Sequence, residues 1–100
     1  MEKLKKDITP EEVQVRIKEL LEGMTELLID KNKKYGNSAL APKKIFSKAD
    51  AVDSIALRLD DKLGRIMNNP SPVPRVNDCA DIIGYLVLML ISIGAGKEDF

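Results

Sequence analysis

The sequence predicts an all-α protein with three main helices, at about residues 10–34, 47–67 and 75–93. Apolar residues recur every three or four positions in each of these segments. Prolines or glycines separate the segments, and no stretch has the alternating pattern of a β-strand. A chain of 100 residues suits a single domain, so we expect one domain over residues 1–100, with residues 1–8 and 95–100 flexible.

The first helix begins with a strong start signal. Thr9 can cap it, Pro10 suits the first helical position, and Glu12 completes a capping box. Gly36 and Asn37 can end the helix by taking left-handed backbone angles. Its apolar stripe spans about five turns of 3.6 residues. The stripe consists of Val13, Ile17, Leu20, Leu21, Met24, Leu27 and Leu28.

The second helix, over residues 47–67, is expected to have Ser47 as its N-cap. One side of it is apolar, with Val52, Ile55, Ala56, Leu59, Leu63 and Ile66. We place four charged residues on the opposite side: Arg58, Asp61, Lys62 and Arg65. Three prolines then interrupt residues 68–74, so this segment is expected to be a semi-rigid connection.

The third helix, over residues 75–93, carries Asp78, Asp81 and Tyr85 on one face. Cys79 beside them is expected to fill the core. The later segment Ile82–Ile93 is almost entirely apolar, and a helix that is apolar on every side must be buried on every side. Three helices cannot surround it, so we expect a homo-oligomer.

Composition limits the possible functions. The chain has 16 basic and 16 acidic residues, so no net charge attracts it to nucleic acid or to a membrane surface. Its longest apolar stretch is shorter than the roughly 20 residues that cross a bilayer. No secretory signal is visible, and we expect a cytoplasmic protein. Without His and with one Cys, a metal would be held by carboxylates, which favours Mg²⁺ or Mn²⁺.

Three aspartates form the candidate metal site. Asp78 and Asp81 lie one helical turn apart and can bind one divalent cation, with Asp61 as a third ligand from the neighbouring helix. The alternative is structural. Asp78 lies in the first turn of its helix, where a carboxylate favours the helix dipole, and Asp81 can pair with Arg58 or Arg65.

Basic residues form the candidate phosphate site. Arg58, Lys62, Arg65 and Lys31 can bind a polyphosphate, the arginines through bidentate contacts and the lysines as point charges. The alternative is a solvated basic face. Two tyrosines, Tyr35 and Tyr85, can stack on a base, although lone tyrosines also serve as packing residues.

Three motifs follow one another in the chain. They are Lys-Asn-x-x-Tyr-Gly at residues 31–36, Arg-x-x-Asp-Lys-x-x-Arg at residues 58–65, and Asp-x-x-Asp-x-x-x-Tyr at residues 78–85. In order and spacing they resemble the phage-borne nucleotide-modification-associated domain family, which is akin to the MazG-like all-α nucleoside triphosphate pyrophosphohydrolases. The resemblance covers residues 31–91.

The resemblance implies a dimeric or tetrameric helical bundle in the host cytoplasm, with a nucleotide site between helices. It implies that Asp61, Asp78 and Asp81 are catalytic ligands of Mg²⁺ and that Asn32, Tyr35 and Tyr85 contact the base or sugar. Arg58, however, stands where the family's first motif has a carboxylate. Three hypotheses remain: hydrolysis of a nucleoside triphosphate to monophosphate and pyrophosphate, binding of nucleotides or cyclic nucleotide signals without chemistry, or an oligomeric phage accessory protein that acts through partner proteins.

Overall fold

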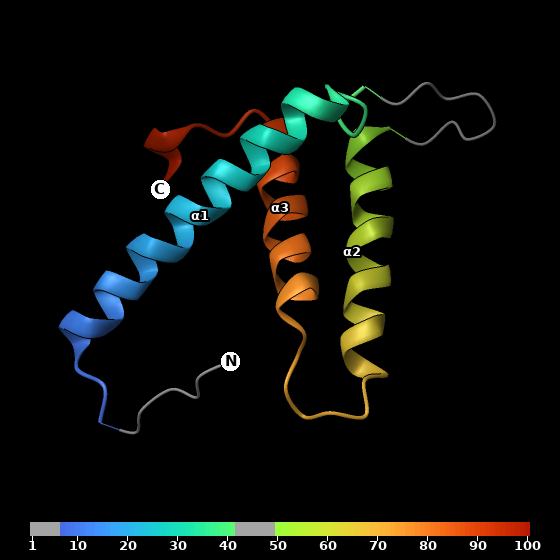
Figure 1. Cartoon of the computed structure of the whole chain (residues 1–100). Coiled ribbons are helices and arrows are strands. Elements are labelled where there is room, and N and C mark those ends of the chain that lie inside the picture. Colours follow the sequence, from blue (N-terminus) through green and yellow to red (C-terminus); the bar gives the residue numbers. More distant parts are fainter. Residues whose placement is uncertain (1–6, 42–49) are drawn as a thin grey trace. The chain divides into compact units, whose positions relative to one another are not determined.

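The computed structural model describes residues 7–41 and 50–100. In these ranges it contains the α-helices Pro10–Tyr35 (α1), Ala51–Met67 (α2) and Val76–Ser92 (α3), a short 3-10 helix Lys97–Asp99 (η1), and no strand (Figure 1). The all-α prediction with three main helices is therefore confirmed. The predicted bounds of α1 and α3 agree with the structure to within one residue at each end.

The chain divides into two compact units, Met1–Lys34 and Tyr35–Phe100. Unit 1 holds all of α1 except its last residue, and unit 2 holds α2 and α3. In unit 2 these two helices pack side by side and run antiparallel, so that they form a helical hairpin (Figure 1). The expectation that both units belong to one domain stays a prediction.

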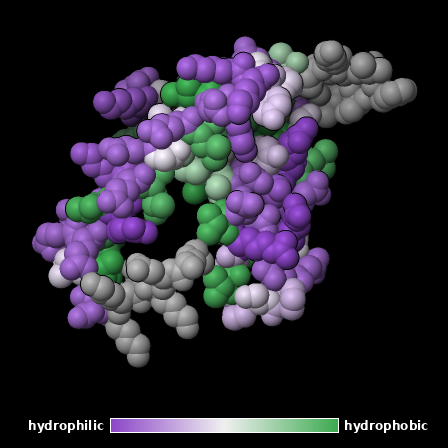
Figure 2. Space-filling view, in the orientation of Figure 1, coloured by the Kyte–Doolittle hydropathy of each residue, from purple (hydrophilic) through white to green (hydrophobic). Residues whose placement is uncertain are grey.

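The ends of α1 follow the predicted signals. The backbone N–H of Glu12 donates to Oγ1 of Thr9 at 3.1 Å, which is the first half of the predicted capping box. Gly36 has a φ of 64°, the left-handed conformation that stops a helix without a steric penalty for glycine. Between these ends α1 buries no residue, and Figure 2 shows apolar side chains interspersed with hydrophilic ones along it.

The start of α2 differs from the prediction. The N-cap is Asp50, whose Oδ1 accepts a hydrogen bond of 2.9 Å from the backbone N–H of Asp53. The predicted cap, Ser47, lies outside the described residues. Serine and aspartate are both good capping residues, so residue type alone does not fix where this helix begins. The extended backbone of Asp50, with a ψ of −179°, sets the beginning of α2 at Ala51.

The predicted orientation of Lys62 is wrong. The sequence analysis placed this residue opposite Ile55, but Lys62 is half-buried and pairs with α3, while Ile55 is the buried apolar residue of α2. The two residues are seven apart, which is close to two full turns of a helix, so they lie on the same face. The face of α2 toward α3 therefore includes a lysine.

On α3, the residues buried among the described ones are Asp78 and Gly84. The side of α3 away from these residues carries an exposed apolar row, called here the outer stripe: Val76, Ile83, Leu86 and Ile93. Cys79 falls within this row on the helical wheel and is exposed, so the prediction that it fills the core is wrong. The described part of unit 2 thus covers α3 on one side.

The end of α3 combines a predicted and an unpredicted feature. Gly94, with a φ of 81°, ends the helix as expected, and the backbone N–H of Ala95 donates to the Leu90 carbonyl at 2.9 Å. The short helix η1 then follows, with the backbone N–H of Gly96 donating to Oδ2 of Asp99 at 2.7 Å. Among the described residues, the structure contains no helix of the length and apolarity that a membrane span requires.

Candidate functional site

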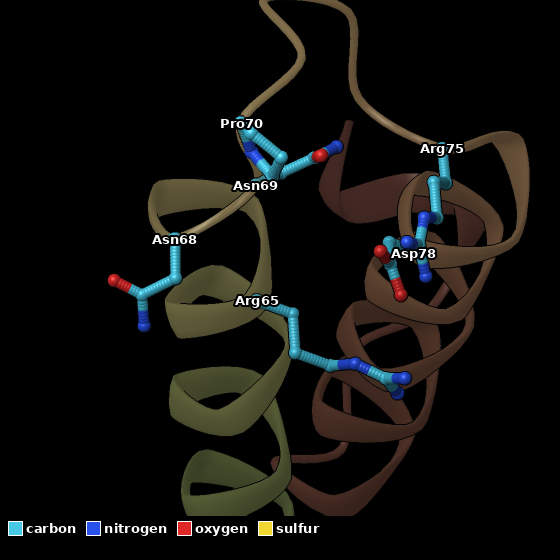
Figure 3. Close-up of a pocket in the computed structure, with 6 residues that line it drawn as sticks. All are labelled: Arg65, Asn68, Asn69, Pro70, Arg75 and Asp78. Carbon is cyan, nitrogen blue, oxygen red and sulfur yellow. The ribbon is translucent and has the colours of Figure 1, made fainter.

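A pocket of about 190 Å³ lies where α2 ends and α3 begins. The connection between the helices closes this end of the hairpin, so residues from both helices and from the connection meet there (Figure 3). The pocket is open to solvent on one side. It is lined by Arg65, Asn68, Asn69, Pro70, Arg75 and Asp78.

Asp78 is the buried acidic group of this pocket. It lies in the first turn of α3 with 5% of its surface exposed. In residues 7–41 and 50–100, no hydrogen bond or ion pair joins its carboxylate to another side chain or to the backbone. Among the described residues no fully buried side-chain oxygen lacks a hydrogen-bond partner, so the carboxylate of Asp78 reaches the solvent of the pocket and is available to a ligand that donates hydrogen bonds or carries positive charge.

Two arginines approach the pocket from opposite sides. Arg65 lies in the last turn of α2 and its side chain extends toward α3, whereas Arg75 is the N-cap residue of α3 (Figure 3). At this end of an antiparallel hairpin the negative terminus of one helix lies beside the positive terminus of the other, so the dipoles largely cancel. The side chains therefore set the local charge, and two guanidinium groups against one carboxylate favour an anion.

The connection that closes the pocket is held by its own side chains. The backbone N–H of Ser71 donates to Oδ1 of Asn69 at 3.2 Å, and that of Val73 donates to Oγ of Ser71 at 3.2 Å. Prolines restrict the backbone on either side of these bonds. The wall formed by Asn69 and Pro70 is consequently stabilised by hydrogen bonds within the connection itself.

One ion pair joins the two helices further along the hairpin. Nζ of Lys62 on α2 lies 2.8 Å from Oδ2 of Asp81 on α3, and their side chains are 17% and 27% exposed. The alternative prediction, that Asp81 is a structural ion-pair residue, is therefore correct in kind, but the partner seen in the described part of the chain is Lys62 rather than Arg58 or Arg65. This pairing engages one predicted phosphate ligand and one predicted metal ligand with each other.

The remaining predicted site residues are spread over the chain. Arg58 and Asp61 are exposed on α2 and do not line the pocket, and Tyr85 is half-buried on α3. Three more are exposed near the end of α1: Lys31, Asn32 and Tyr35. Lys31 and Asn32 take part in interactions of their own. Their contacts with a base, sugar or phosphate stay predictions.

The predicted metal ligands do not form a group of three. In the described ranges, no set of three or more Asp, Glu, His or Cys residues is placed to hold one metal ion. Asp78 lines the pocket, Asp81 pairs with Lys62, and Asp61 is exposed. Asp78 could still hold Mg²⁺ together with one or two phosphate oxygens of a bound molecule, since this ion keeps several waters and needs few carboxylates. Magnesium binding stays a prediction.

Sequence reasoning missed Arg75 as a site residue, together with the polar residues of the connection. A signal for it was present, because Arg75 directly follows Pro74 and is the first residue of the predicted third helix. Three prolines between two helices make a short, closed connection, and such a connection brings the residues on either side of it together. Arg65 and Arg75 were thus candidates for one site despite their separation in sequence.

Comparisons of the chain with protein-family models, with curated proteins and with solved structures found no match. The resemblance to the nucleotide-modification-associated domain family therefore rests on the three motifs alone.

Proposed function

We propose that the chain binds a nucleotide through its phosphates, in the pocket between the end of α2 and the start of α3. The observation that carries the proposal is that Arg65 and Arg75 line one pocket with the buried carboxylate of Asp78. Arginine presents paired N–H donors that match phosphate oxygens, and two arginines on opposite walls can hold one phosphate group between them.

Asp78 supplies the second part of the recognition. A carboxylate repels phosphate, so a ligand that was only a phosphate would leave it unsatisfied. A nucleotide also carries sugar hydroxyls and base N–H groups, which donate hydrogen bonds, and its phosphates bring Mg²⁺ with them. The pocket thus suits a ligand that combines an anionic part with a hydrogen-bond donor or a bound cation.

The volume of the pocket limits how much of the ligand it encloses. About 190 Å³ is below the roughly 300–1,000 Å³ of pockets that enclose whole small molecules. The phosphates and part of the sugar would occupy it, and the base would lie outside. The motif resemblance implies Asn32, Tyr35 and Tyr85 as contacts for the base or sugar, and of these Tyr35 and Tyr85 belong to unit 2, which holds the pocket.

Binding is better supported than hydrolysis. The resemblance to phage MazG-like enzymes implies Mg²⁺-dependent release of pyrophosphate, with Asp61, Asp78 and Asp81 as the catalytic carboxylates. Because Oδ2 of Asp81 pairs with Nζ of Lys62 at 2.8 Å, this carboxylate could offer both of its oxygens to a metal only after a rearrangement of the ion pair. Binding by Arg65 and Arg75 requires no such rearrangement, so a non-catalytic binder of nucleotides or cyclic nucleotides is the favoured form of the proposal.

The test is calorimetry with ATP, a deoxynucleoside triphosphate, a monophosphate and a cyclic dinucleotide, each with and without Mg²⁺. We expect binding of at least one nucleotide, and Arg65→Ala should weaken it by about 1.5–3 kcal/mol, the value of a charge-assisted hydrogen bond. Arg58→Ala is the matched control, because it removes an exposed arginine from the same helix outside the pocket. Equal losses in the two variants would refute the pocket as the site.

Two further measurements separate the forms of the proposal. Asp78→Asn should lower the affinity for the nucleotide that binds the wild-type protein. The affinity for inorganic pyrophosphate should stay the same or rise, since the substitution removes a negative charge beside the phosphates. Product analysis on each bound triphosphate then tests hydrolysis. Release of pyrophosphate that requires Mg²⁺ and is lost in Asp78→Asn would establish the enzyme and would contradict the binder.

A further inference from the structure

The apolar stripe of α1 has no counterpart within its own compact unit. Unit 1 holds a single described helix, and no residue of α1 is buried. Leu20 near the middle of the stripe is 62% exposed, although leucine is among the residues most often buried in folded proteins. A row of this length on one helix is typical of a helix that packs against another helix.

The order of the apolar residues in this row is symmetric. Six of them are Val13, Ile17, Leu20, Leu21, Met24 and Leu28. The steps between successive members are four, three, one, three and four residues, and they read the same from either end. Leu27 is the one stripe residue outside this pattern, since the position that mirrors it is Gln14. The centre of symmetry lies between Leu20 and Leu21.

Such symmetry has a direct structural meaning. When two identical helices pair antiparallel about a two-fold axis, each residue meets the residue at the mirrored position of the other copy. With the axis between Leu20 and Leu21, Val13 of one copy lies opposite Leu28 of the second, and Ile17 lies opposite Met24. Every apolar residue of the symmetric row then meets another apolar residue.

The charges of α1 favour the same orientation. The first turn of the helix is acidic, with Glu11 and Glu12. The end of the helix is basic, with Lys31, Lys33 and Lys34. Antiparallel pairing brings the basic end of each copy beside the acidic start of the other, whereas parallel pairing places like charges together. The charges at the two ends of α1 therefore favour antiparallel over parallel self-pairing.

We propose that α1 forms an antiparallel pair with α1 of a second copy of the chain, about a two-fold axis between Leu20 and Leu21. This interface uses a surface separate from the pocket of unit 2. It therefore stands or falls independently of nucleotide binding.

Disulfide trapping tests both the pairing and its register, in full-length protein that carries Cys79→Ser to remove the native thiol. A disulfide requires Cα atoms about 4.4–6.8 Å apart. We expect Val13→Cys mixed with Leu28→Cys to form the mixed covalent dimer under mild oxidation. Each variant alone should remain mostly uncrosslinked. In an antiparallel pair, residue 13 of one copy lies about 22 Å along the helix axis from residue 13 of the other copy.

The matched control is Val15→Cys mixed with Glu26→Cys. These positions have the same symmetric relation as Val13 and Leu28 but lie on the opposite face of α1, so they should not crosslink. Circular dichroism verifies that each variant keeps its helix content. Crosslinking of Val13→Cys with itself would show parallel pairing. Equal crosslinking of the control pair would show random collision. Absence of crosslinking in all mixtures would show that α1 does not pair with itself. Each of these results would overturn the proposal.

Discussion

Lys62 is the residue at which the sequence-based prediction and the structure differ most. A lysine in an amphipathic segment is ordinarily assigned to the solvent side, although Lys62 lies two helical turns from Ile55 and so shares its face. The structure places Lys62 toward α3 because Asp81 is there to neutralise it at 2.8 Å. The partner lies on another helix, so no pattern within α2 indicates it.

We expect the Lys62–Asp81 ion pair to contribute an amount of stability between that of an exposed pair and that of a buried pair. Exposed ion pairs contribute about 0–1 kcal/mol, and breaking a buried pair costs about 3–5 kcal/mol. With side chains 17% and 27% exposed, Lys62→Met should lower the free energy of unfolding by about 1–3 kcal/mol. Methionine keeps the apolar stem, so the loss reports the charge.

A double-mutant cycle with Asp81→Asn completes this test, with urea unfolding as the measurement. Asp81 has further interactions, so its single substitution alone would not isolate the pair. Strong coupling between the two substitutions is expected. If their effects simply add to within about 0.5 kcal/mol, the ion pair does not stabilise the hairpin. If Asp81→Asn stabilises the protein, carboxylate repulsion at a metal site becomes the better explanation.

At the scale of the helices, prediction succeeded where a local signal determines the end. Thr9, Gly36 and Gly94 act through their own backbone or through a residue three positions away, and all three ends agree with the structure. The start of α2 was less determined, since Ser47 and Asp50 both suit an N-cap. The choice between two adequate caps depends on the path of the preceding chain, which sequence patterns do not specify.

The cap of α2 gives a prediction with a built-in control. Asp50→Ala removes the side chain that accepts from the Asp53 N–H at 2.9 Å, and should cost about 1 kcal/mol of stability. Ser47→Ala should change stability by less than about 0.5 kcal/mol. Chemical denaturation of both variants measures this. The opposite ranking would show that α2 begins at Ser47 in solution, as the sequence analysis expected.

The grouping of residues in the candidate site also depends on the path of the chain, which sequence patterns do not specify. Arg65 and Asp78 were identified as site residues from their charge and helical spacing, but their grouping with Arg75 depends on how the connection of residues 68–74 closes the hairpin. The predicted three-carboxylate group would require Asp61 and Asp81 to face the same space. The structure directs Asp81 to Lys62 instead, so the helical spacing was right and the inferred partner was wrong.

At the scale of the whole molecule, the main feature is that few of the described residues are buried. Among the described residues the fully buried apolar side chain is Ile55. A chain of this size normally removes more than half of its surface from water on folding, and its stability depends on that burial. The stripe of α1 and the outer stripe of α3 are the surfaces that can supply the missing burial through association.

The outer stripe of α3 is a second exposed apolar surface of the chain. It presents Val76, Ile83, Leu86 and Ile93 at helical spacing, and a second copy of the same face can cover it. Two separate self-complementary surfaces on one chain generate a closed tetramer when their two-fold axes meet at a right angle, whereas one such surface generates a dimer. With the proposed α1 pair, we therefore expect light scattering of the wild type to give four times the mass of one chain.

Single substitutions should then divide the tetramer in defined ways. Leu86→Asp buries an unpaired charge in the α3 contact and should leave a dimer joined through α1, while Leu20→Asp should leave a dimer joined through α3. The double variant should be a monomer of low stability. Leu57→Asp is the control, because this residue is exposed on α2 outside both stripes, and it should leave the mass unchanged. A wild type that is monomeric at micromolar concentration would contradict the expected association, and loss of assembly in Leu57→Asp would place the contact on α2.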